Sequence, residues 1–476
     1  MKTDKIIRQF PAIFCLLLLL SSHAGAAITV NSLADPLTPE PGQVTLRSAV
    51  GSAAGGEVIN FDPALDGQTI GLTIVGQEHS ILKGEIMGMT NAPSGPVSYL
   101  VGYYERDYGR SALYAQKDVV IDASALSHGI TVKWMGGDVD PARVLAVYGD
   151  LTMKNVSVTG GRSVAVELPD PDPEDEYAQL STRARGGALA VWGVADLENC
   201  RLYDNKCSRG GAVPARSRDA GVFGGGIYAD IVEISDSIIS GNEVEASGVS
   251  GGGVFSVGGA DTWQKVSLIE RTSITGNKIA GILTYGGGIY PDGGGIGKMK
   301  TLQLVNCTIA DNLVGIWGPG YLYGIGYWRG GGVYMSNGLL DILGCTIVNN
   351  QVHGVARTNE LDKPNLAGGI AATIGNAHAA ENMAVGQSII AGNTVHEYGG
   401  AVYNQDIFAG SLQHFFSTGH NRIGVLEFSQ ILVPVGEPDW FSLCRRHFPN
   451  TGDQEGVNVS NVVELAYGAT EAADIL

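Results

Sequence analysis

A short line of residues that ends in asparagine recurs along the middle of this chain. Two copies are VEISDSIISGN at 232–242 and LDILGCTIVNN at 340–350, and a looser one is LIERTSITGN at 268–277. The closing asparagines follow one another at steps of 37, 35, 35, 38 and 43 residues; they are Asn205, Asn242, Asn277, Asn312, Asn350 and Asn393. A near-constant step of this size is typical of repeat architectures, in which each unit stacks on the next. We therefore expect a solenoid.

The copy at 286–312 shows the pattern within one unit. It opens with three glycines and the β-forming pair Ile289 and Tyr290, and it then turns into an alternating strand. In that strand Leu302 and Leu304 flank Gln303, as expected when one face of a strand is buried. Because one unit has too few strands to bury its own apolar side, equivalent strands are predicted to pair in parallel about 4.8 Å apart.

Three kinds of residue recur at matched positions of the units. The asparagines are expected to exchange side-chain amide hydrogen bonds from coil to coil. Glycine triplets at 224–226, 251–253, 286–288 and 330–332 are expected to provide positive φ and close backbone approach at turns. Small residues suited to a crowded corner share a third position; they are Cys200, Ser237, Thr272, Cys307, Cys345 and Ser388.

Composition supports an all-β solenoid and limits the partners. The chain of 476 residues has 69 glycines and only 16% charged residues, which suits a repetitive β-structure. Its 44% hydrophobic residues are enough for a continuous core, so disorder is not expected. A net charge of −18 argues against nucleic acid or anionic lipid as a partner.

Residues 1–26 have the features of a secretory signal peptide. Lys2, Lys5 and Arg8 precede a short apolar run at 10–20, and Ala24-Gly25-Ala26 is a small-residue cleavage pattern. The apolar run is too short for a spanning helix, and no later segment resembles one. We expect the protein to be exported to the cell surface or the medium. We also expect it to be a monomer.

Five cysteines lie beyond the expected cleavage point. Cys307 and Cys345 occupy one position in neighbouring coils, so they either form a disulfide or are buried thiols in an interior column. No CxxC spacing and no Cys/His cluster indicates a metal, and no cofactor is expected. Asp230 and Asp292 each follow a GGGIY run, which we interpret as one shared repeat position two coils apart. At roughly 9–10 Å they are too far apart for one calcium ion, which favours a turn-forming role.

The N-terminal part of the chain resembles a known family. Thr45-Leu46-Arg47-Ser48-Ala49-Val50 is similar to the Ser-Leu-Arg-Glu-Ala-Ile-type motif of bacterial secreted right-handed parallel β-helix proteins, with Ser48 in place of the usual acid. The segments 119–132 and 143–161 read as two further coils. The GGA-aliphatic runs at 186–189, 210–213 and 399–402 resemble repeats of polymorphic outer-membrane proteins. The resemblance implies the pectin-lyase-like superfamily, whose members include lyases, hydrolases, adhesins and inert scaffolds.

We therefore predict an all-β chain folded as a single-stranded right-handed parallel β-helix of about ten coils with end caps. The expected boundaries are a signal peptide at 1–26, the solenoid at 27–424 and a C-terminal cap or tail at 425–476. An N-terminal cap is expected at 27–66 and an insertion at 87–116.

Two segments have the composition of binding sites. The insertion brings together tyrosines and arginines that suit an acidic sugar, or that simply dock the insertion on the coil; they are Tyr103, Tyr104, Arg106, Tyr108 and Arg110. The aromatic-glycine loop at 313–329 suits a carbohydrate platform or a hydrophobic lid; its rings are Trp317, Tyr321, Tyr323, Tyr327 and Trp328.

No catalytic residue can be assigned, because the chain lacks the Asn-Thr-Asp, Asp-Asp, Gly-His-Gly and Arg-Ile-Lys motifs of polygalacturonase-like enzymes. The leading hypothesis is a secreted or cell-surface protein that binds glycans or other surface partners, as an adhesin does. The alternatives are a lyase or hydrolase of acidic polysaccharide, and a structural surface-layer component.

Overall fold

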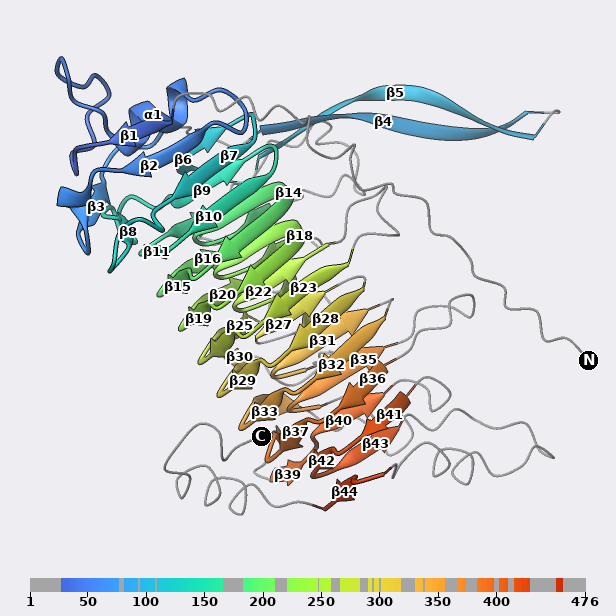
Figure 1. Ribbon diagram of the computed structural model, residues 1–476. Coiled ribbons are helices and arrows are strands. Elements are labelled where there is room, and N and C mark those ends of the chain that lie inside the picture. Colours follow the sequence, from blue (N-terminus) through green and yellow to red (C-terminus); the bar gives the residue numbers. More distant parts are fainter. Residues whose placement is uncertain are drawn as a thin grey trace, which may run out of the picture.

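The protein is a parallel β-helix, in which short strands from successive coils stack into long sheets along one axis (Figure 1). This confirms the predicted fold class. The computed structural model describes residues 27–76, 81–92, 95–107, 109–165, 183–209, 221–246, 248–257, 266–282, 290–292, 295–298, 301–317, 330–336, 339–355, 367–373, 383–397, 402–409, 415–428 and 451–456. The predicted signal peptide and most of the predicted C-terminal tail lie outside these residues. Within them, no helix is long and apolar enough to cross a membrane.

The largest sheet contains two parallel files of strands that meet at a bend. File a consists of β6 (Ser111–Ala115), β9 (Arg143–Val147), the first halves of β14 (Leu189–Glu198) and β18 (Ile227–Ser235), β22 (Val254–Ser256), β27 (Ile296–Lys298), β31 (Val333–Ser336), β35 (Ile370–Thr373), β40 (Ile407–Ala409) and β43 (Leu426–Phe428). File b consists of β1 (Ile28–Val30), β2 (Val58–Phe61), β7 (Val119–Asp122), β10 (Leu151–Lys154), the second halves of β14 and β18, β23 (Ser267–Glu270), β28 (Leu302–Val305), β32 (Leu340–Leu343), β36 (Met383–Gly386) and β41 (Phe415–Gly419).

Three further sheets follow the same axis. The corner sheet contains β3 (Thr69–Leu72), β8 (Ile130–Trp134), β11 (Val156–Thr159), β15 (Arg201–Tyr203), β19 (Ile238–Ser240), β24 (Ser273–Thr275), β29 (Thr308–Ala310), β33 (Thr346–Val348), β37 (Ile389–Ala391), β42 (Arg422–Ile423) and β44 (Gln454–Glu455). The side sheet contains β12 (Arg162–Val164), β16 (Lys206–Ser208), β20 (Glu243–Ala246), β25 (Lys278–Ile282), β30 (Leu313–Trp317), β34 (Gln351–Val355), β38 (Thr394–Glu397) and β39 (Val402–Asn404). The return sheet contains β13 (Arg183–Arg185), β17 (Gly221–Phe223), β21 (Gly248–Ser250) and β26 (Tyr290–Asp292).

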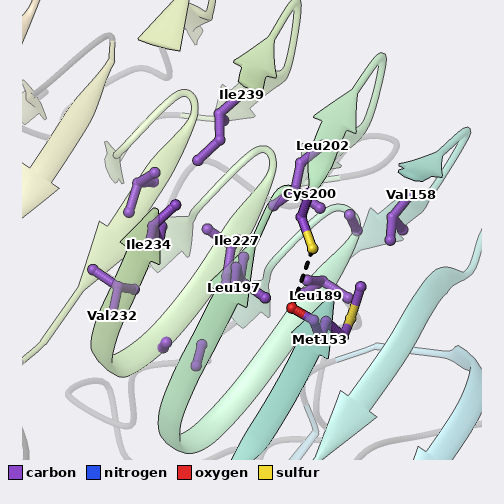
Figure 2. Packing of buried hydrophobic residues seen from close by; sticks show 14 of the residues in the cluster. Met153, Val158, Leu189, Leu197, Cys200, Leu202, Ile227, Val232, Ile234 and Ile239 are labelled. Atoms are coloured by element: carbon purple, nitrogen blue, oxygen red, sulfur yellow. Dashed lines mark hydrogen bonds between the residues drawn. The ribbon is translucent and has the colours of Figure 1, made fainter. Parts of the chain in front are cut away.

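The interior has two separate apolar compartments. The main core lies between the largest sheet and the corner sheet, where residues such as Leu197, Leu202 and Ile239 stack from coil to coil (Figure 2). A second, narrower core is formed by the side and return sheets; its members are Ala165, Ala184, Cys207, Val222, Val244, Ile279, Val314, Val352 and Val395. From β12 onward, the coils therefore contribute to both a large and a small apolar cluster, and only stacking on the next coil completes either one.

A narrow neck of glycine and asparagine backbone divides the two compartments. A Cβ atom placed on Gly225 would lie 2.2 Å from Gly252 O and 2.8 Å from Glu243 O, so no larger residue fits there. Gly224, just before it, has a φ of 73° and turns the chain into file a. The predicted roles of this triplet, positive φ and close backbone approach, are confirmed.

One assignment of the repeat is wrong. We expected the triplet at 286–288 to begin a unit, but strand pairing places Ile296 opposite Val254, so that Gly295 is the counterpart of Gly253. Asp292 consequently lies in the return sheet opposite Ser250 and does not share a position with Asp230. The run GGGIYPDGGG holds two triplets, and only the pairing with the preceding coil distinguishes them.

The asparagines form the predicted ladder, on the main-core side of the neck. Asn312 is fully buried and donates its Nδ2 to Asn350 Oδ1 and to Ile274 O, both at 2.9 Å. Its own Oδ1 accepts hydrogen bonds from the backbone N and the Nδ2 of Asn277, both at 3.0 Å. The same pattern links all six asparagines in one direction and ends on Asp406.

The small-residue column is also as predicted, and its thiols are free. Cys307 N donates to Cys345 Sγ at 3.4 Å, and Cys345 N donates to Ser388 Oγ at 3.0 Å. Cys200 Sγ donates to Met153 O at 3.3 Å, the dashed contact in Figure 2, and burial raises the pKa of this thiol to about 12. Cys200, Cys207, Cys307 and Cys345 are all buried free thiols, which confirms the second of the two interpretations. Cys444 lies outside the described residues.

The N-terminal end of the stack is covered by α1 (Leu46–Ser52), followed by the 3₁₀ turn η1 (Pro63–Leu65). Thr45 and Ser48 form a capping box at the first turn of α1, which satisfies backbone N–H groups that have no partner within this helix. Arg47 extends from this helix to pair with Asp35 at 2.7 Å, and it also donates to Ala112 O and Ile74 O. The motif that carried the family resemblance thus ties the cap to the first coils.

At the other end, both polar columns finish on acidic side chains. Asp406 occupies the position of the third neck glycine, and its Oδ1 accepts from Asn393 N and Nδ2, both at 2.8 Å. Its Oδ2 accepts from Val425 N at 2.8 Å. In the small-residue column, Asn421 N donates to Asp453 Oδ1 at 2.8 Å. Carboxylates are suited to these ends because they accept hydrogen bonds on all sides and need no further acceptor.

Candidate functional site

The two predicted sites are only partly within the described residues. Tyr103, Tyr104 and Arg106 lie on β5 (Gly95–Asp107), which pairs with β4 (Ile81–Ala92) in a two-stranded ribbon. Trp317 is the last residue of β30 in the side sheet. The other predicted rings, Tyr108, Tyr321, Tyr323, Tyr327 and Trp328, lie outside the described residues.

Arg110 belongs to the solenoid and does not lie on the ribbon. It precedes β6, and its Nη1 donates to Asp140 Oδ1 at 2.5 Å. Asp140 also contributes its backbone oxygen to the indole Nε1 of the buried Trp134, at 2.8 Å. The hydrogen bond from Arg110 holds this residue against the solenoid beside Asp140 and Trp134.

A file of five aromatic rings runs along the outer face of file a, and none of them was singled out in the sequence. Tyr148 and Trp192 stack in parallel, with ring centroids 4.2 Å apart and planes 3° apart. Tyr114 meets Tyr148 edge-on at 5.6 Å, and Tyr228 follows Trp192 at 6.1 Å. Phe255 continues the file at 5.8 Å from Tyr228. We call these five residues the aromatic file.

Strand register explains how the rings come together. Tyr114, Ala146, Ala190, Tyr228 and Phe255 occupy one register position of five successive coils. Their strand neighbours, such as Leu145 and Val147, belong to the main core, so this position faces outward. Tyr148 and Trp192 lie two residues after the alanines, and small side chains at 146 and 190 leave room for their rings. Five coils at about 4.8 Å give a file about 19 Å long.

The accessible part of the file is its N-terminal end. Tyr114, Tyr148 and Trp192 are half-buried, whereas Tyr228 and Phe255 are only 6% and 4% exposed. The guanidinium of Arg185 lies 4.7 Å from the Tyr228 ring centroid and so supports the buried end of the file by a cation–π contact. The row of three accessible rings therefore packs against the buried rings of Tyr228 and Phe255 at the other end of the file.

Carboxylates line the bend beside these rings. Asp118 and Asp150 are exposed, and each accepts a backbone hydrogen bond: Asp118 from Asp150 N at 2.9 Å, and Asp150 from Val194 N at 2.8 Å. On the adjacent outer face of file b, Asp196 is in register with Glu233. Partial burial raises the pKa of Asp196, nearby Glu198 raises it further, and Lys154 opposes both. The surface around the rings is thus acidic and rich in hydrogen-bond acceptors.

This surface offers a ligand two kinds of contact. The outward edges of the stacked rings offer an apolar surface to the C–H groups of a ligand, and fixed carboxylates accept hydrogen bonds from its hydroxyl groups. Among the described residues, no group of three or more His, Cys, Asp or Glu side chains is placed to hold a metal ion.

Comparison with known proteins provides no further guide, since no family model, no curated protein and no solved structure gives a significant match to the chain.

Proposed function

We propose that the protein is exported and binds glycan chains along the outer face of its solenoid, as a member of the pectin-lyase-like superfamily. The observation that carries this proposal is the aromatic file, above all the parallel pair of Tyr148 and Trp192 with Tyr114 beside it. Partly exposed aromatic side chains in a pre-ordered row give proteins an apolar surface with which to contact the C–H groups of sugars. The stacked coils fix the spacing of the rings, so binding orders few side chains.

The charges around the file favour a neutral polysaccharide. Asp118 and Asp150 are exposed beside the rings, and Asp196 and Glu233 lie across the bend. Carboxylates at these positions accept bonds from sugar hydroxyls but repel a polymer of uronates. The proposed ligand therefore differs from the acidic polysaccharide that we considered from the tyrosines and arginines of the insertion.

The test is a binding panel of neutral glucans, xylans and mannans together with polygalacturonate, scored by affinity electrophoresis and calorimetry. We expect a neutral polymer to bind and Trp192→Ala to weaken its affinity about tenfold, equivalent to about 1.4 kcal/mol. Trp192→Phe should retain much of the affinity because a ring remains. Tyr203→Ala is the matched control, since Tyr203 is a half-buried tyrosine on the corner sheet, away from the file.

Three results would count against the proposal. Absence of binding to every neutral polymer would favour the structural surface-layer role. Equal affinity of the Trp192→Ala and Tyr203→Ala variants would place the site elsewhere on the chain. Release of unsaturated products from polygalacturonate would favour the lyase alternative.

A further inference from the structure

Among the described residues, the largest feature outside the solenoid is a two-stranded antiparallel arm. β4 and β5 pair over twelve registered positions, from Ile81 opposite Asp107 at the base to Ala92 opposite Gly95 at the tip. In Figure 1 the arm leaves the N-terminal end of the stack and extends away from it, without another labelled element beside it. Twelve positions at about 3.4 Å each give a length of about 40 Å. Neither strand pairs with any other described strand.

An isolated ribbon of this length has little to stabilise it in water. A two-stranded hairpin is marginally stable by itself, and each of its outer edges presents a row of main-chain donors and acceptors. The sequence from Ile86 to Tyr104 contains no charged residue, although the whole chain has a net charge of −18. Exposed edges are usually protected by lysine or other charged residues, and this segment has none.

The two edges of the arm differ in how well each could pair with a further strand. β5 contains Pro96, which cannot donate a backbone hydrogen bond, and Val101, which the register skips between the pairs of Ile86 and Met87. Proline and bulges are features that make an edge unsuitable for further pairing. β4 has neither over its twelve residues, Ile81–Ala92. The edge of β4 is therefore the one that remains open.

We infer that the β4 edge pairs with β4 of a second copy of this chain, antiparallel about a twofold axis, to form a four-stranded sheet. A strand edge is complementary to itself in this arrangement, as an isologous contact requires. Charge also favours the arm over any other contact between copies. Two solenoids of this net charge repel each other, but arms that overlap along their length hold them about 40 Å apart, several times the Debye length of about 8 Å at physiological ionic strength.

This assignment differs from the monomer that we expected from the sequence. It is independent of the glycan proposal, and it would place two aromatic files on one particle.

The first test is the mass of the intact protein by sedimentation equilibrium over a range of concentrations. We expect a reversible dimer, and we expect a variant in which residues 82–106 are replaced by a short Gly-Ser linker to be a monomer. Because the arm contributes no strand to the solenoid sheets, this variant should lose only the ribbon's share of the circular dichroism, and it should melt at the temperature of the intact protein measured at a concentration where that protein is a monomer. A monomer at every concentration, or a dimer that survives removal of the arm, would overturn the inference.

Cross-linking tests the edge without removing the arm. Single cysteines at Gly88→Cys or Thr90→Cys on β4 should give a covalent dimer under a mild oxidant. Ser98→Cys on β5 is the matched control, because it lies opposite Met89 on the far strand of the same arm. Cross-linking through position 98 that equals cross-linking through β4 would contradict the choice of edge.

Discussion

Replacing Asn312 by aspartate tests whether the asparagine ladder holds neighbouring coils together. The change keeps the size and shape of the side chain but removes both Nδ2 hydrogen bonds, to Ile274 O and to Asn350 Oδ1, each 2.9 Å long. At a net value of about 1 kcal/mol per bond, their loss costs about 2 kcal/mol. Asn306→Asp is the matched control, because Asn306 lies in the same coil at an exposed turn.

The new carboxyl group adds a cost that depends on pH. If the new carboxyl group is to remain neutral in the column at pH 7, its pKa must rise by roughly 3 units, which is equivalent to about 4 kcal/mol. The two N–H donors of Asn277 favour the charged form and offset part of this cost. We therefore expect Asn312→Asp to destabilise the protein by about 4 kcal/mol at pH 7. With a raised folded-state pKa, the folded variant binds more protons than the unfolded chain, so its stability falls as pH rises through the interval from about 4 to that pKa.

Urea unfolding followed by circular dichroism at pH 7 and pH 4.5 measures both effects. The deficit of Asn312→Asp relative to the natural protein should shrink to about 2 kcal/mol at the lower pH. Asn306→Asp should stay within about 0.5 kcal/mol of the natural protein at both values, as exposed substitutions usually do. Equal stabilities of the two variants at pH 7 would refute the view that the ladder couples the coils.

Two further predictions concern the neck and the side sheet. Gly225→Ala should lower the free energy of unfolding in urea by about 3 kcal/mol, because its Cβ would overlap backbone oxygen atoms. The control is Gly51→Ala in α1, where a Cβ would have nothing within 4 Å; this change should be neutral or stabilising by up to about 1 kcal/mol. Similar values for the two variants would contradict the packing argument. His353 and His396 stack at 3.9 Å on adjacent coils; the pKa of each is lowered by burial, and that of His353 also by His396. The free energy of unfolding should therefore fall as the pH drops from about 6.5 toward these lowered pKa values. In urea unfolding at several pH values, His396→Gln should flatten this dependence. An unchanged slope in the variant would contradict the assignment of the pH dependence to this histidine pair.

The elements that the sequence predicted correctly are those that repeat at one position. The closing asparagines and the small-residue column recur at nearly constant steps, and parallel stacking converts that recurrence directly into contact, as for Asn312 and Asn350. The neck glycines were predicted for the same reason. Gly295 was missed because an equally good triplet lies a few residues earlier, and the choice between them depends on pairing with the preceding coil.

The aromatic file could not have been found in this way. Its rings come from two repeat positions, with Tyr114, Tyr228 and Phe255 at one and Tyr148 and Trp192 two residues further on. The coils that supply them also differ in length, so no alignment of repeats places the rings in one column. A useful sign would have been the alanines at 146 and 190, since small residues on an outward strand position leave space for neighbouring rings.

The way the asparagine ladder ends has a consequence for how the protein can change in length. Every amide points in the same direction, from the N-terminal coils toward Asp406, which only accepts. A duplicate of residues 278–312 inserted after Asn312 would keep each donor facing an acceptor, so the rod can lengthen from within. Beyond Asp406 the next coil contributes a backbone donor, Val425 N, whereas another asparagine at this position would set its side-chain oxygen against the carboxylate. The sheets continue past this point, but the asparagine ladder cannot.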